Sequence, residues 1–209
     1  ALAEGYWKPS YKYLRARWRL GAEDAEDLTQ SFFAQVLEKR YFDGYDPARA
    51  RFRTYLRTCL DRFAANRRRA ERRLKRGGGE AVVSLDSAPG WHPDFAAAER
   101  ELGRSAPADR LADGSPEADP EAWFHREWRR ALFQRAVARL RERAAGGREA
   151  GLTYAALGEE LGLPATQVTN HLAWARRELR KIVLELLEEL CGSDEEVAAE
   201  ARDLVGAGA

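Results

Sequence analysis

The sequence predicts an all-α protein made of two small helical domains joined by a long acidic linker. Three observations support this fold class. Apolar residues recur at helical spacing on both sides of a central stretch that lacks such a period. That stretch, residues 77–121, contains five prolines and several glycines, which interrupt regular structure. A short β-like run at residues 82–86 is too isolated to build a sheet.

Composition limits the class of protein. A chain of 209 residues with 44% hydrophobic and 33% charged residues can form two modest cores. It contains no run of 18 apolar residues and no signal-peptide pattern in its first residues, so we expect a cytoplasmic protein without membrane insertion. Two distant cysteines and three scattered histidines predict no disulfide framework, no metal site and no cofactor.

Two helices open the first domain, residues 1–76. The first, at about residues 8–19, has Pro9 near its start and is expected to end at Gly21. The second covers residues 22–40, and residues 41–49 form a turn. The apolar stripes are Trp7, Tyr11, Leu14 and Trp18 in the first helix, and Ala25, Leu28, Phe32 and Val36 in the second. Tryptophans on such stripes, including Trp123 and Trp128 further on, are expected in the core.

A strongly basic helix follows at residues 47–76. It holds twelve Arg or Lys residues and only two acids, a net charge of +10 in a chain whose total is +1. Its first half has one apolar face, and past Ala65 the arginines point in every direction. Because so many like charges repel one another without a counter-anion, we expect this helix to bind a polyanion, with nucleic acid as the first candidate.

The charge is segregated further along the chain. Residues 77–122 carry a net charge of −7, and residues 185–209 carry −7 again. We interpret residues 77–121 as a linker, with a short helix near residues 95–102. The second domain, residues 122–190, opens with an apolar helix from Trp123 to about Arg143.

A helix-turn-helix pattern completes the second domain. Tyr154, Leu157 and Leu161 mark a short helix, residues 161–164 a tight turn, and residues 168–190 a long helix. Amide side chains early in that helix can pair with adenine edges in a major groove, while its arginines hold phosphates. The tail, residues 191–209, predicts a short amphipathic helix that could act as an intramolecular or partner-regulated cover.

Three segments in this order, residues 24–37, 52–73 and 152–180, resemble bacterial RNA polymerase sigma factors of the sigma-70 family. The nearest group is the small extracytoplasmic-function type. The resemblance implies a factor that binds core RNA polymerase and directs it to promoters. It implies contact with the clamp helices of the largest subunit and with a flap of the second subunit, and no catalytic residues of its own.

The resemblance also assigns residues. Polymerase binding falls to Asp24, Asp27, Leu28, Gln30 and Phe33. Capture and melting of the −10 element fall to the loop at residues 42–46 and to Phe52, Arg53, Tyr55, Arg62, Asn66, Arg69, Arg72 and Arg73. Reading of the −35 duplex falls to Thr166, Gln167, Thr169, Asn170 and His171, with Arg176, Arg177 and Arg180 on phosphates.

Several alternatives stay open. The acidic linker either imitates RNA in the polymerase cleft or is a plain tether. An anti-sigma factor or a regulatory kinase is a further candidate partner. Thr169 and His171 stand where comparable helices carry Lys or Arg, so base preference does not transfer. A stand-alone helix-turn-helix regulator is the second function class, although it leaves residues 24–37 and 47–76 unexplained. The motifs of a nucleic-acid enzyme are missing from the sequence.

Overall fold

The computed structural model describes residues 2–38, 42, 44–74, 94–104, 119–146 and 165–206. Within these ranges the chain is helical and contains no strand, which confirms the all-α class. Two compact units form: Ala1–Arg129, called the first unit here, and Arg130–Ala209, the second unit. The boundary between them falls inside helix α5, after the predicted start of the second domain at residue 122.

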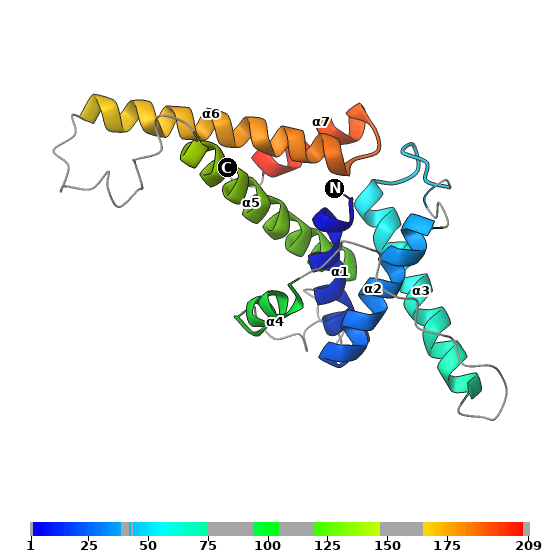
Figure 1. Cartoon of the computed structure of the whole chain (residues 1–209). Coiled ribbons are helices and arrows are strands. Elements are labelled where there is room, and N and C mark those ends of the chain that lie inside the picture. The colour runs from blue at the N-terminus through cyan, green and yellow to red at the C-terminus, as the bar shows by residue number, and fades with distance from the viewer. Residues whose placement is uncertain are drawn as a thin grey trace. The chain divides into compact units, whose positions relative to one another are not determined.

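Helix α1 (Leu2–Trp18) occupies the middle of the first unit, with α2 (Ala22–Glu38), α3 (Phe52–Leu74) and α4 (Phe95–Arg104) packed against it (Figure 1). Every residue from Pro9 to Leu14 is buried, including the polar Ser10 and Lys12. A helix covered on all sides has no solvent face. The single apolar stripe predicted from the sequence therefore underestimates how much of the α1 surface is buried.

Helix α1 differs from its prediction at both ends. It starts six residues earlier than residue 8, so Pro9 lies inside the helix. It ends at Trp18, and Arg19, not Gly21, is the residue with a left-handed backbone, at φ 51°. Gly21 instead precedes α2, where its carbonyl accepts the Ala25 N–H at 3.0 Å.

Helices α2 and α3 follow the predicted periodicity. In α2 the predicted stripe is buried throughout, at 6% exposure or less. In α3 the apolar face is buried through Ala64. Of the four stripe tryptophans expected in the core, Trp128 is fully buried, whereas Trp7, Trp18 and Trp123 are half-buried.

Helix α5 (Pro120–Gly146) contributes to both units, and α6 (Ala165–Leu190) and α7 (Asp194–Gly206) complete the second. In the second unit α7 folds back against α6 (Figure 1), which confirms the predicted tail helix. Its start is a capping box, in which the Ser193 hydroxyl accepts the Glu196 N–H at 3.2 Å and the Glu196 carboxylate accepts the Gly192 N–H at 2.9 Å. The core of this unit is Ala131, Leu132, Ala136, Ile182, Leu186, Leu187 and Leu190.

Candidate nucleic-acid interface

The second half of α3 separates its cations from its core face. Arg62, Asn66, Arg69 and Arg73 are exposed and spaced i, i+4, i+7 and i+11, so they form one row along the helix. Arg72 beside them is also exposed. Leu56, Leu60 and Ala64 on the other side are buried. We call the four residues Arg62, Asn66, Arg69 and Arg73 the basic row. Such a row can neutralise phosphates along a strand.

An aromatic cluster lies at the start of α3 and includes the preceding loop. The ring centroids of Phe42 and Tyr45 lie 5.0 and 5.1 Å from that of Phe52, and Tyr45 lies 5.3 Å from Tyr55. An Asx turn at Asp46, whose carboxylate accepts the Ala48 N–H at 3.0 Å, shapes the loop. Tyr45 and Tyr55 are half-exposed and can offer ring faces to an unstacked base. Phe52 is only 5% exposed and holds the cluster together from inside, and its role in capturing the −10 element stays a prediction.

Arg53, also predicted to contact the −10 element, is 8% exposed, and its guanidinium lies 5.6 Å from the Trp128 ring centroid. The cause is the first turns of α5, which cover the start of α3. Glu121 accepts hydrogen bonds from the Thr54 hydroxyl and, at 3.4 Å, from Arg57. These α5 residues belong to the first unit, whereas the sequence analysis assigned Glu121 to the linker and Trp128 to the second domain.

Asp61 ties α3 to α1. Its carboxylate accepts hydrogen bonds from the Trp18 indole at 2.9 Å, the Tyr13 hydroxyl at 3.1 Å and Arg57 at 2.9 Å. Burial and the nearby Asp61 charge raise the pKa of Tyr13 to about 12. Asp61 precedes Arg62 directly, so this anchor fixes the rotation of α3 that turns the basic row outward. The sequence analysis missed it, although Asp61 is one of only two acids in the basic stretch.

The residues predicted for polymerase binding divide into two groups. Asp24 and Asp27 are exposed on α2 and Gln30 is half-buried. Phe33 is fully buried in the core, so it supports α2 from inside and does not present its ring to a partner. Leu28 is 6% exposed. Burial, followed by repulsion from Asp27 and Glu23, raises the pKa of Glu26, which shows how acidic this end of α2 is.

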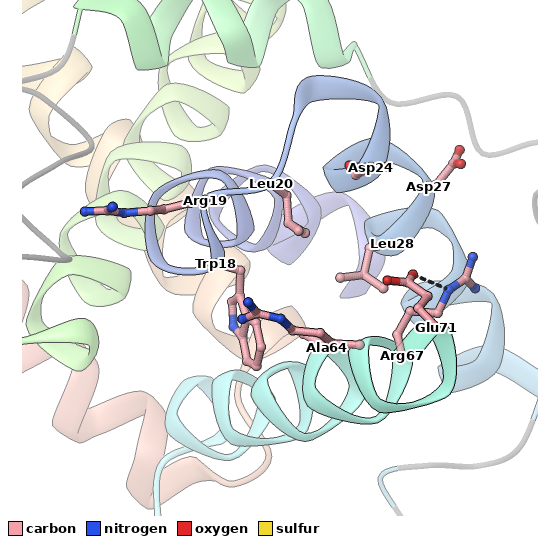
Figure 2. A pocket seen from close by; sticks show the side chains of 10 residues that line it. Trp18, Arg19, Leu20, Asp24, Asp27, Leu28, Ala64, Arg67 and Glu71 are labelled. Atoms are coloured by element: carbon pink, nitrogen blue, oxygen red, sulfur yellow. Dashed lines mark hydrogen bonds and ion pairs between the residues drawn. The ribbon is translucent and has the colours of Figure 1, made fainter. Parts of the chain in front are cut away.

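A pocket of about 460 Å³ adjoins these carboxylates. It lies where the end of α1, the start of α2 and the last turns of α3 meet (Figure 2). Its apolar lining comprises Trp18, Leu20, Leu28 and Ala64. Its charged lining comprises Asp24, Asp27 and Glu71 together with Arg19, Arg67 and Arg68. The Arg67 and Glu71 side chains are paired at 3.3 Å.

Helix α4 lies inside the stretch predicted as a linker. Its glutamates bind side chains of α1. Glu99 accepts from Arg15 at 2.6 Å and from the Tyr11 hydroxyl at 2.7 Å. Glu101 accepts from Lys8 at 2.7 Å and from Lys12 at 2.9 Å. Phe95 packs edge-on against Trp7 and tilted against Tyr11. Burial alone would raise the pKa of Glu101, but the hydrogen bonds from Lys8 and Lys12 outweigh it and lower the pKa to about 2.

Lys12 has a second carboxylate partner, Glu127 of α5, at 2.9 Å. Lys12 is 1% exposed and Glu127 is 6% exposed, and an ammonium buried this deeply needs such pairing. Some of the acidic charge that follows the basic helix therefore neutralises cations within the first unit.

In the second unit, helix α6 carries an exposed polar face. Asn170, Arg177 and Lys181 are exposed at i, i+7 and i+11, with Arg176 and Arg180 beside them, and His171 is half-buried. The other side of α6 is joined to α5 by ion pairs of Arg139 with Glu189 at 2.8 Å and of Arg143 with Glu185 at 2.5 Å. The side chains of Thr166, Gln167 and Thr169, and the predicted first helix and turn at residues 154–164, lie outside the described residues.

Two absences hold for the part of the chain that the structure describes. No helix there is both long and apolar enough to cross a membrane. No group of three or more His, Cys, Asp or Glu side chains there could hold a metal ion.

Comparison with protein families identifies the first unit. Residues 7–74, which contain α2, α3 and all but the first five residues of α1, match the family Sigma-70 region 2. No curated protein and no solved structure matches the chain. These residues therefore form a Sigma-70 region 2, which supports a factor of the sigma-70 family that acts in transcription initiation.

Proposed function

We propose that this chain is an extracytoplasmic-function type sigma factor of the cytoplasm that brings core RNA polymerase to promoters, melts the −10 element and reads the −35 element as duplex. The observation that carries the proposal is the basic row of α3, which lies within the region-2 match and is exposed over its whole length.

Melting requires phosphate neutralisation together with surfaces that hold an unstacked base. The basic row supplies the first, and the half-exposed rings of Tyr45 and Tyr55 supply the second. Unstacking costs a few kcal/mol, and one base stacked on an aromatic side chain returns about 1–3 kcal/mol. Several contacts must therefore act together. The aromatic cluster and the basic row lie on one helix, so they can engage the same strand.

The other two contacts belong to α2 and α6. The exposed Asp24 and Asp27, with Gln30, would bind the clamp helices of the largest polymerase subunit. On α6, Asn170 would face base edges while Arg176, Arg177 and Arg180 hold phosphates. The Thr166, Gln167, Thr169 and His171 assignments, the flap contact, and an anti-sigma factor or kinase as regulator belong to the same proposal.

Run-off transcription with purified core polymerase over a pool of genomic promoters tests the function. We expect discrete start sites that depend on this chain. Gel shifts separate the alternative, because a sigma factor should bind promoter duplex poorly without core polymerase. Tight binding by the isolated chain, together with no start-site selection in the run-off assay, would instead identify a stand-alone regulator.

A further inference from the structure

The pocket at the junction of α1, α2 and α3 is not used by any role assigned so far, apart from the carboxylates at its edge. Figure 2 shows Trp18, Leu28 and Ala64 around its interior, with Asp24 and Asp27 on the α2 side and the Arg67–Glu71 pair on the α3 side. An apolar floor with a rim of both charges characterises a protein-binding surface more than a small-molecule site.

Nucleic acid does not fit this pocket. Its three arginines, Arg19, Arg67 and Arg68, are matched by three carboxylates, Asp24, Asp27 and Glu71, so the pocket offers phosphates no net attraction. Its α3 residues also lie on the side of the helix away from the basic row. Ala64, Arg67 and Glu71 are spaced i, i+3 and i+7, and each is displaced by more than a quarter turn from the Arg62–Arg73 row at about 100° per residue.

Continuity points to the occupant, since Asp24 and Asp27 line the pocket and also form the exposed acidic face of α2. We propose that the polymerase-binding surface extends from α2 across this pocket to the last turns of α3. The pocket receives a lysine or arginine side chain of the polymerase helix bound by α2: its stem lies on Trp18 and Leu20, and its charge meets the α2 carboxylates. Arg68, on the opposite rim, pairs with an acidic residue of the same partner. This inference rests on the proposed function.

Neighbouring arginines of α3 provide a matched test. Arg68 lines the pocket, Arg69 belongs to the basic row, and both are exposed. Arg68→Glu and Arg69→Glu therefore make the same charge change on two surfaces, one proposed to bind the polymerase and the other to bind DNA. We expect Arg68→Glu to weaken binding of the full chain to immobilised core polymerase by about tenfold or more, and Leu20→Ala by several-fold. Arg69→Glu should leave that affinity unchanged and should weaken binding of the assembled holoenzyme to fork-shaped promoter DNA. Thermal unfolding of each variant checks the fold.

The remaining outcomes separate this inference from the proposed function. If Arg68→Glu binds core polymerase as the wild type does while Asp27→Lys does not, α2 is an interface and the pocket is not part of it. Equal weakening by Arg68→Glu and Arg69→Glu would reveal a general charge effect and overturn the inference. Absence of binding by the wild-type chain would overturn both.

Discussion

Arg19 has a backbone φ of 51°, in the left-handed region that terminates α1. This conformation costs a non-glycine residue about 1 kcal/mol, and glycine commonly occupies such a position after a helix. The helix ends there because Arg15 reaches over the last turn and donates to the Leu20 carbonyl. Local strain is thus offset by a side-chain cap.

We predict that Arg19→Gly raises the free energy of unfolding by about 0.5–1 kcal/mol, because glycine removes the strain while the gain in unfolded-chain entropy offsets part of it. Arg17→Gly is the matched control. Arg17 is exposed inside the last turn of α1, and glycine there should lower stability by about 1 kcal/mol. Urea denaturation followed by circular dichroism measures both. Equal destabilisation by the two changes would contradict a strained Arg19.

Asp61 is the residue on which the orientation of α3 depends. We predict that Asp61→Ala lowers the free energy of unfolding by about 2–3 kcal/mol, because it removes the acceptor for Tyr13, Trp18 and Arg57 and the Tyr13 side chain is fully buried. Asp61→Asn keeps an acceptor oxygen and should lose about half as much. Denaturation monitored by tryptophan fluorescence provides the measurement. A neutral effect of Asp61→Ala would show that α3 is held by its apolar face alone.

At the scale of elements, α4 shows how charge and packing combine. Its Phe95 and Ala98 are buried, while Glu99 and Glu101 engage four donors of α1, namely Lys8, Tyr11, Lys12 and Arg15. The pKa of Glu99 is lowered, chiefly by the hydrogen bond from Arg15. Burial raises this pKa, but the hydrogen bonds from Arg15 and Tyr11 together outweigh burial. Attachment of α4 should therefore depend on pH.

The direction follows from the pKa values. For Glu101 the folded-state pKa of about 2 lies below its ordinary value of 4.5, so its stabilising effect is complete above about pH 4.5 and is lost as the pH falls towards 2. We predict that hydrogen exchange in α1 and α4 accelerates over this window relative to the intrinsic rate. Glu101→Gln should destabilise α4 near neutral pH by about 2 kcal/mol and flatten the pH dependence. Glu188→Gln on exposed α6 is the control, and an unaltered pH profile in Glu101→Gln would refute the assignment.

At the scale of the whole molecule, sequence periodicity predicted the helices that bury one face and expose the other. Helices α2 and α3 each bury one stripe. The exposed row from Arg62 to Arg73 was not predicted, because the arginines past Ala65 were expected to point in every direction. The tail helix was also predicted, because Val197, Ala201 and Leu204 recur at helical spacing.

What could not be predicted depends on residues far apart in the chain. Helix α1 is enclosed by partners such as Glu101 and Glu127, 89 and 115 residues from Lys12, and no local pattern encodes that pairing. The same distance explains why the burial of Arg53 was not predicted: Trp128, which covers it, was expected in another domain. The acids of residues 94–121 were interpreted as linker charge, whereas several of them neutralise α1 and α3.

Some arginines of α3 are exposed in the basic row and others are paired with carboxylates, and this difference leads to a prediction for the intact factor. In a preassembled holoenzyme, neutralising Arg69 and Arg73 by Arg69→Gln and Arg73→Gln should weaken open-complex formation. The double variant should reduce the slope of log K against log salt by about two, since each lost phosphate contact removes about one. Arg67→Gln is the control, because Arg67 is paired with Glu71 away from the basic row, and its slope should equal that of the wild type. Filter binding over a range of salt concentrations measures all three. If the double variant kept the wild-type slope, the basic row would face solvent in the complex, and strand capture would have to rely on the aromatic cluster.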